Sequence, residues 1–201
     1  MARNENPPFP RGGLGTGYSD PATVDTTSLT HLEGKEWLFE DQDPTIVDGV
    51  ASGRTNQYVR CRCVRNVSGG ALLPKRFAMY KTDGTGAGDY GGRVSGYGTQ
   101  GKAGGIIDEY LPAAGVPANE LFWLVVEGPT KVTTDTAGDT NISVGSYVQP
   151  GGTGDGTVVD QTAATDGATA QSLTQGVIGR AMAAVNATAT DFLINVRRMD
   201  A

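Results

Sequence analysis

The residues that could do chemistry in this chain are few and scattered. The single histidine, His31, lies in an acidic polar stretch, so a Ser-His-Asp arrangement would depend on one residue in an expected loop. The only cysteines, Cys61 and Cys63, lack the second cysteine pair or the nearby histidines that a tetrahedral zinc site needs. On a strand they would point the same way about 6.6 Å apart, near the outer limit of disulfide geometry. We therefore expect two buried free thiols, which fits folding in a reducing cytoplasm.

Glycine-rich segments and acids give only weak indications of a ligand site. Segments 12–17 and 83–92 are rich in glycine, but neither matches the phosphate-loop pattern G-x-x-x-x-G-K-[ST]. Segment 151–155 approaches a calcium-binding nonapeptide repeat, yet that architecture needs stacked copies and the unit occurs once. Asp135 and Asp139, in a polar loop, could ligate a hard cation. Since no pair of acids stands out for hydrolysis either, we expect no catalytic residue, no metal and no cofactor.

Charged residues fall in two blocks of opposite sign. Residues 54–81 contain seven Lys and Arg and no acid, whereas residues 20–48 contain eight acids and one Lys. The blocks either balance as solvated faces within one fold or form complementary surfaces between subunits. On the second interpretation the strand face around Arg60 and Arg62 is an interface, and charge reversal at both should weaken assembly. The net charge of −6 disfavours nucleic acid as a partner.

Composition predicts one turn-rich domain with little core material. Leu, Ile, Val and Phe make up 40 of 201 residues, and Gly plus Pro make up another 40. The apolar fraction is near the level of about 20% below which chains tend towards disorder. No apolar run is long enough to span a membrane, and residues 1–11 do not have the pattern of a secretory signal. We expect a chain that folds but gains stability by packing against partners.

The first half of the chain contains one convincing strand. Residues 1–30 predict an extended arm, either floppy or ordered along a neighbouring subunit. Residues 32–48 predict short strands or a loop with aromatic anchors. Residues 58–67 alternate in character: Val59, Cys61 and Cys63 should share one face of a strand and Tyr58, Arg60, Arg62 and Val64 the other.

Three further segments of this half are interrupted by Pro or Gly. Pro74 confines any strand in 71–80 to an edge or to either side of that residue. Residues 82–105 predict a long loop or a glycine-broken hairpin, and residues 106–111 allow one helical turn before Pro112.

The C-terminal part predicts many short strands. The expected strands are 121–126, buried on both faces and broken by Gly128-Pro129, then 131–134 as an edge, 142–148, 157–159, 177–185 and 192–196. For 181–184 a helix is equally compatible with propensity, but glycines 176 and 179 favour a strand. The fold class is mainly β: a small β-barrel or β-sandwich-like domain over 31–201, with long Gly-rich loops and 121–201 as its best-defined part.

Four C-terminal segments resemble the capsid decoration, or cement, proteins of tailed bacteriophages. They are 122–126, 142–149, 176–183 with its Ile-Gly-x-Ala strand, and 192–198 with alternating apolar residues that end in Arg. The resemblance implies a small β-barrel-like domain without enzyme activity. It also implies a homotrimer at threefold positions on the outer capsid, which bridges neighbouring major capsid protein subunits.

We therefore predict a structural virion protein, made in the host bacterial cytoplasm, with the major capsid protein and itself as partners and no nucleic acid or membrane contact. The candidate interface residues are Arg60, Arg62, Arg65, Trp37, Phe39, Pro8, Phe9 and Pro10. The alternative is a carbohydrate- or receptor-binding β module of a tail, fibre or cell surface. Exposed aromatics with polar groups in one groove would favour the alternative, whereas a flat basic face and an outward arm would favour cement. Two carboxylates about 5–9.5 Å apart in a cleft would indicate a hydrolase.

Overall fold

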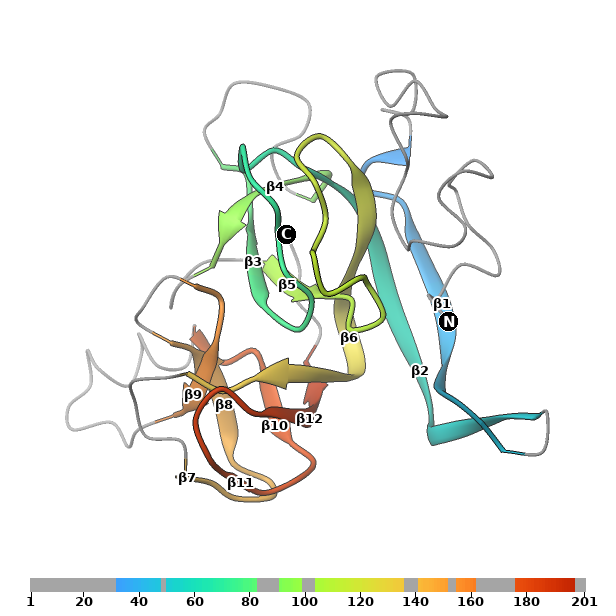
Figure 1. The fold of residues 1–201 in the computed structure, drawn as a ribbon, viewed down its shortest axis with the longest axis vertical. Helices are drawn as coiled ribbons and strands as arrows, with labels where there is room; N and C mark the ends of the chain where they lie inside the picture. The colour runs from blue at the N-terminus through green and yellow to red at the C-terminus, as the bar shows by residue number, and fades with distance from the viewer. Residues whose placement is uncertain are drawn as a thin grey trace.

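A computed structural model describes the chain over residues 32–47, 50–82, 91–98, 104–135, 141–151, 155–161 and 176–197. The predicted arm and its residues Pro8, Phe9 and Pro10 lie outside these ranges. Strands dominate the described part, so the prediction of a mainly β, sandwich-like domain is confirmed (Figure 1). In this part of the chain no helix is long and apolar enough to cross a membrane.

Ten of the twelve strands in the described ranges belong to one continuous sheet, in the order β1-β2-β4-β3-β5-β6-β12-β10-β8-β9, and β7 pairs with β11 separately. Their bounds are β1 Glu36–Val47, β2 Val50–Asn66, β3 Phe77–Tyr80, β4 Arg93–Tyr97, β5 Gly104–Ile107, β6 Leu121–Thr133, β7 Asn141–Ile142, β8 Tyr147–Pro150, β9 Val158–Asp160, β10 Gly179–Ala181, β11 Val185–Asn186 and β12 Asp191–Val196.

Five strands form a closed circuit of hydrogen-bonded neighbours, which we call the strand ring. β2 pairs with β4, β4 with β3, β3 with β5, β5 with β6, and β6 returns to β2. Only two residue pairs join β2 to β4, so the ring is irregular. In Figure 1, its strands β3, β4 and β5 lie above the C-terminal strands β8, β9, β10 and β12.

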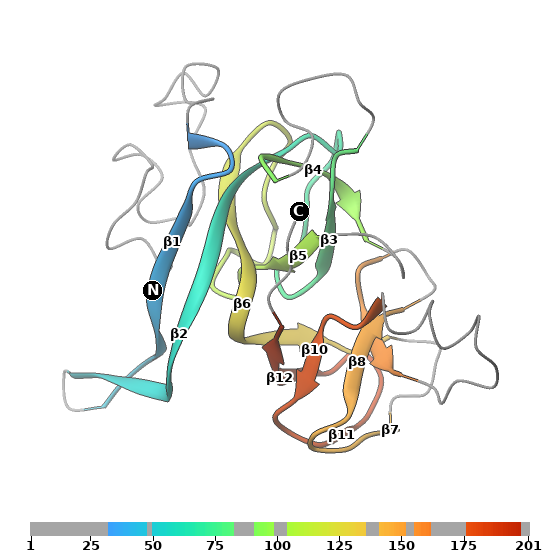
Figure 2. The ribbon, with the colours of Figure 1, turned by 180° about the vertical axis from the view of Figure 1, so that it is seen from behind.

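The strand β6 continues from the ring into a second layer, the C-terminal sheet of β6, β12, β10, β8 and β9. Its first half pairs with β2 and its second half with β12, and it bends where it passes from one to the other (Figure 2). The predicted break at Gly128-Pro129 is therefore wrong. Gly128 adopts a φ of +100°, which L side chains rarely adopt, so the chain bends there without ending the strand.

The alternation predicted for 58–67 is confirmed in β2. Val59, Cys61 and Cys63 are fully buried, whereas Tyr58 is 61% exposed. Both cysteines are free and buried, as expected. Val64 follows the outward-facing residues in sequence but is also fully buried, because the strand ring covers that face of β2 at its C-terminal end.

Two clusters of buried side chains stabilise the fold from opposite faces of β6. The larger runs from the ring into the C-terminal sheet, with Trp123 and Val125 beside Val132 and Ile194. The smaller lies against the other face and contains Phe122 and Leu124 with side chains of β2, β3, β4 and β5. The prediction that 121–126 is buried on both faces is confirmed.

The predicted helical turn at 106–111 is wrong. Ile106 and Ile107 end strand β5, where they pair with β6 and are fully buried. Sheet pairing on both sides of β5 outweighs the weak local preference for a helix. A turn follows, in which the Leu111 amide donates to the Asp108 carbonyl at 3.3 Å.

Other local predictions agree with the structure in part, since a turn splits the predicted strand 142–148 into β7 and β8. Strand β3 begins after Pro74. The described residues of 82–105 contain β4 and the start of β5, and both pair with β3 rather than with each other, so these strands do not form the predicted hairpin. In β12, Phe192, Ile194 and Val196 are buried and share one face. Segment 177–185 contains the strands β10 and β11 and no helix.

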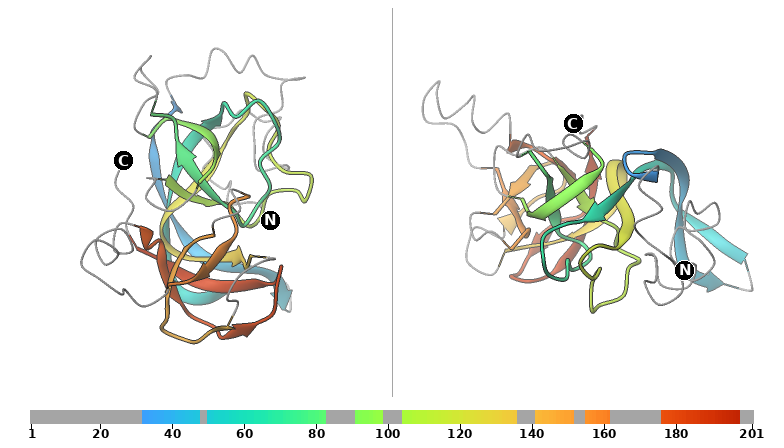
Figure 3. Two further views of the ribbon diagram at one scale, coloured as in Figure 1. Left: turned by 90° about the vertical axis from the view of Figure 1, so that its left-hand side faces the viewer. Right: turned by 90° about the horizontal axis from the view of Figure 1, so that it is seen from above.

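The β1–β2 hairpin extends beyond the rest of the sheet. Its inner part pairs with β6 through Arg60 to Arg65 of β2, whereas the outer hairpin, residues 42–47 and 50–53, pairs only within itself among the described strands. Figure 3 shows this hairpin projecting from the body of the molecule. A two-stranded hairpin alone is marginally stable in water, so this element gains most from a partner.

Candidate functional site

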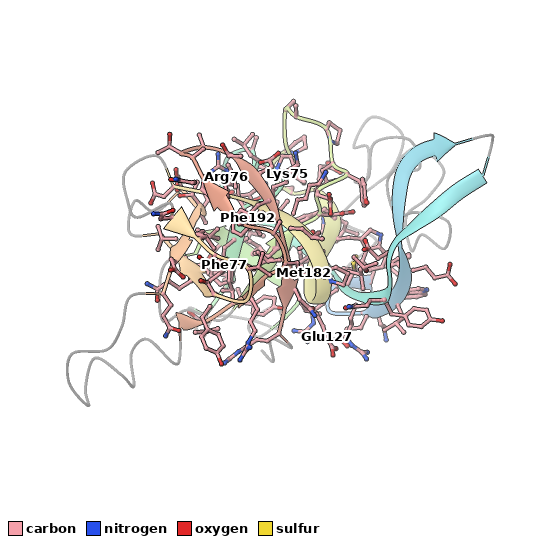
Figure 4. All side chains as sticks on the ribbon, turned by 90° about the horizontal axis from the view of Figure 1, so that it is seen from below. Lys75, Arg76, Phe77, Glu127, Met182 and Phe192 are labelled. Carbon is pink, nitrogen blue, oxygen red and sulfur yellow. The ribbon has the colours of Figure 1, made fainter. Side chains whose placement is uncertain are left out.

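A groove lies where the β1–β2 hairpin meets the C-terminal sheet, with a cavity volume of about 610 Å³. Strands from distant parts of the sequence line it, and Figure 4 shows one lining residue, Glu127, between the hairpin and the C-terminal strands. The lining residues are Leu38, Gln57, Tyr58, Arg60, Glu127, Gly128, Tyr147, Val177, Gly179, Arg180, Asn195, Val196 and Arg197.

Exposed apolar side chains gather in this groove. Leu38 is 49% exposed, Tyr58 61% and Tyr147 45%, and only two other large hydrophobic residues of the described part are comparably exposed. Leu38 and Tyr58 face outward because the residues beside them in β1 and β2 point into the core. Exposed apolar groups that gather in a concave site typically mark a binding surface.

Guanidinium groups surround these apolar side chains. Arg180 lies over the Tyr147 ring, 4.4 Å from its centroid, and donates a hydrogen bond to the Tyr147 hydroxyl. Arg60 donates to Glu127 at 2.9 Å and lies 3.6 Å from Glu36. Among the described residues no carboxylate lies within ion-pair distance of Arg180 or Arg197. Three guanidinium groups and one carboxylate therefore line the groove of a protein whose net charge is −6.

Two amides and two glycines complete the lining. The Asn195 amide donates to the Gln57 side-chain oxygen at 3.5 Å, which links β12 to β2 across the groove. Gly128 and Gly179 approach neighbouring backbone so closely that an added Cβ would lie 2.4 Å from a carbonyl oxygen. The groove thus combines aromatic rings, which make apolar contacts, with guanidinium groups and amides, which form hydrogen bonds, and all three can bind a ligand.

The predicted basic interface residues are engaged within the chain. Arg62 donates to Glu36 at 2.5 Å and to the Tyr80 hydroxyl at 3.1 Å. Arg65 is 7% exposed and donates to Glu33 at 2.5 Å. The acidic and basic blocks thus pair with each other inside this fold at several points, as the first of the two interpretations predicts. The interface role of Arg60, Arg62 and Arg65 stays a prediction, and Arg60 is the one that also lines the groove.

The predicted aromatic anchors pack on the core. Trp37 and Phe39 are half-buried, and their ring centroids lie 6.0 Å and 5.2 Å from that of Trp123. The Phe39 ring meets Trp123 edge to face, a favourable aromatic geometry. These contacts fix β1 against β6 and turn Leu38, between them in sequence, towards the groove. The prediction that Trp37 and Phe39 contact another subunit remains untested.

The described residues contain no cluster of three or more His, Cys, Asp and Glu side chains that could hold a metal ion. Asp135 is buried, and Asp139 and His31 lie outside the described ranges. Burial raises the pKa of the Cys63 thiol far above its ordinary value, with a smaller opposing effect of Arg65, so this cysteine stays protonated. A protonated, fully buried thiol does not act as a nucleophile.

Among solved structures, the chain is similar to a phage head fibre protein. It is the N-terminal base of the head fibre protein gp8.5 of bacteriophage phi29, with a TM-score of 0.42 and 14% identity over 70% of this chain and 96% of that chain. This likeness is too low to assign a fold family or a function to the chain. No protein family model matches, and no curated protein matches.

Sequence reasoning missed most of the groove. Tyr147 and Arg180 lay in predicted strands, but nothing local indicated that β8 and β10 would face Tyr58 of β2. The available signal was the alternation in 58–67, which placed Tyr58 on the outer face of its strand. An aromatic side chain on the solvated face of a strand is a candidate for a binding residue.

Proposed function

We propose that this chain is a non-enzymatic structural protein of a tailed-phage virion that binds the outer capsid and cements neighbouring major capsid protein subunits. The observation that carries the proposal is the projecting β1–β2 hairpin. Its outer residues have no strand partner besides each other in the described part of the chain. A capsid surface would supply the packing that this hairpin lacks, and repeated contacts around a symmetric shell would add avidity.

The segments that carry the resemblance to decoration proteins lie near one another in the sheet. The four segments that carry it fall largely within β6, β8, β10 and β12, which are neighbours in the C-terminal sheet. They therefore form one compact unit from which the hairpin projects. The phi29 neighbour is a phage head fibre protein, but a TM-score of 0.42 is too low for that match to count as evidence for the proposal.

The hairpin can be tested directly on phage heads. In the test variant an Asn-Gly turn replaces residues 43–52, which removes the outer hairpin and keeps the β2–β6 pairing. We expect an unchanged thermal transition and a loss of at least about tenfold in affinity for purified heads, since a lost contact worth about 1.4 kcal/mol has that effect. Full occupancy of heads by this variant would contradict the proposal.

The predicted arm and trimer belong to the same proposal and need separate measurements. Deletion of residues 1–30 should abolish head binding and leave the fold intact, as judged by circular dichroism. Sedimentation of the purified chain should give three times the mass of 20.8 kDa. A strictly monomeric chain that still saturates heads would remove self-association from the mechanism.

A second candidate function, carbohydrate binding, is favoured by the groove. Two exposed tyrosines, Tyr58 and Tyr147, share one concave site with amide and guanidinium groups. This is the arrangement that favours a carbohydrate- or receptor-binding module. The two functions use different surfaces, the groove and the outer hairpin, so one chain can perform both.

A further inference from the structure

We infer that the groove binds a short stretch of a carboxylated polysaccharide, with sugar rings on the tyrosines and sugar carboxylates on the arginines. The inference rests on the second proposed function and specifies the chemical class of its ligand. It concerns the lining groups of the groove and is independent of capsid binding.

The size of the groove favours a saccharide over a folded protein partner. A volume of about 610 Å³ lies within the range of about 300–1,000 Å³ that is typical of small-molecule sites. A stable protein interface covers roughly 800 Å² on each partner, usually as a broad surface. A few sugar units in a chain would fill a groove of this size.

The apolar groups of the groove suit the C–H faces of sugar rings. Tyr58 offers the most exposed ring in the lining, and Leu38, opposite Arg60 on the neighbouring strand, lies diagonally across from it. Tyr147 is held by Arg180 over its ring and at its hydroxyl, so its orientation is fixed before a ligand arrives. A preorganised side chain loses less entropy on binding.

The charge of the groove selects for acidic sugars. Glu127 already pairs with Arg60, which leaves Arg180 and Arg197 without a described carboxylate partner. A guanidinium group binds a carboxylate through two parallel hydrogen bonds, so it distinguishes a uronate from its ester. The Asn195 and Gln57 amides can exchange hydrogen bonds with the sugar hydroxyls, since their mutual contact is long at 3.5 Å.

The test uses three carboxylated hexasaccharides as probes: hexagalacturonate, hexamannuronate and hexasialic acid. Binding to the full chain is measured by titration calorimetry, and fully methyl-esterified hexagalacturonate serves as the matched neutral control. We expect at least one acid to bind, its affinity to fall with added salt, and esterification of hexagalacturonate to weaken binding by about tenfold or more.

Two groove variants and one matched control locate the site. Tyr58→Ala and Arg180→Gln should each weaken binding by about tenfold while the thermal transition stays unchanged, because both side chains are exposed. Lys35→Gln removes an exposed positive charge outside the groove and should leave binding unchanged.

Each alternative outcome of these binding experiments would contradict a specific part of the inference. Equal binding of the esterified probe would overturn the acidic specificity and leave carbohydrate binding standing. Equal binding of hexaglutamate, with no effect of Tyr58→Ala, would show that the groove only attracts negative charge. Failure of all three acids to bind would overturn the inference. If neutral hexasaccharides then bind, carbohydrate binding by the groove still stands; if they also fail to bind, the second proposed function is overturned as well. Occupancy on heads is measured independently.

Discussion

Glu33 is the residue on which the charge pairing of the strand ring depends most. Its carboxylate accepts from Arg65 at 2.5 Å and from Arg93 at 2.8 Å, and its side chain is only 7% exposed. Arg65 also donates to the Asn119 carbonyl at 2.6 Å. One acid from the segment before β1 therefore pairs with two guanidinium groups, on β2 and β4.

We predict that Glu33→Gln lowers the free energy of unfolding by about 3 kcal/mol or more, because it removes the buried carboxylate that Arg65 and Arg93 share. Glu36→Gln is the matched control. Glu36 is 27% exposed, so its loss should cost about 1 kcal/mol. Urea unfolding of both variants measures the difference, and equal costs would contradict the dominant role of Glu33.

Cys63 gives a pH dependence whose sign follows from burial. Burial raises the pKa of its thiol in the folded protein, so folding favours the protonated form. This contribution to stability is complete below the unfolded pKa of about 8.5 and is lost progressively as the pH rises above it.

We predict that the native protein resists labelling by a thiol reagent at pH 8 and that both cysteines react after unfolding. Between pH 8 and 10 the wild type should lose more stability than the Cys63→Ala variant, because only the wild type exposes this ionisable thiol on unfolding. Rapid labelling of the native state would contradict the assigned burial.

At the residue scale, the sequence predicted which side chains are buried where burial depends only on neighbouring residues in the same strand. The alternation that buries Val59, Cys61 and Cys63 is a property of one strand, so it could be read from the sequence. The partners of Arg62 and Arg65 could not, because Glu36 and Glu33 lie 26 and 32 residues away in the chain. Only the pairing of β1 with β2 brings these charges together.

At the scale of elements, Gly128 lets β6 bend, so that the first half of the strand pairs with β2 and the second half with β12. Its φ of +100° produces the bend, and an added Cβ would lie 2.4 Å from the Tyr58 carbonyl oxygen. The sequence indicated a strand end at this glycine because Gly-Pro usually interrupts strands. The strand continues because β12 pairs with β6 through residues 128–133.

We predict that Gly128→Ala lowers the free energy of unfolding by about 3 kcal/mol or more, through backbone strain and collision with β2. Gly145→Ala separates these causes. Gly145 has a φ of +86° but nothing within 4 Å of an added Cβ, so only strain of about 1–2 kcal/mol should remain. Denaturant unfolding measures both, and equal losses would show that the contact with β2 is unimportant.

At the scale of the whole molecule, β6 makes the two layers one folding unit. The larger core cluster continues from Trp123 in the ring to Ile194 in the C-terminal sheet without interruption. Side chains that share one cluster should lose their packing together. The sequence could not show this continuity, because β2 and β12 reach β6 from opposite ends of the chain.

We predict that Ile194→Val lowers the free energy of unfolding by about 1 kcal/mol. The unfolding midpoint measured by the fluorescence of Trp37 and Trp123 should shift by the same amount as the midpoint measured by far-ultraviolet circular dichroism. Both tryptophans report on the ring side of β6, whereas the substitution lies in β12. A shift in circular dichroism without a shift in fluorescence would show that the layers unfold independently.

The long overlap of β2 with β6 has a mechanical consequence. A pull on the inner part of β2 along its own length is parallel to the strand axis. The hydrogen bonds between β2 and β6 from Arg60 to Arg65 would then be loaded in shear, all at the same time. A hairpin anchored in this way resists extraction far better than one whose bonds open one after another, which suits an attachment that must survive sustained tension.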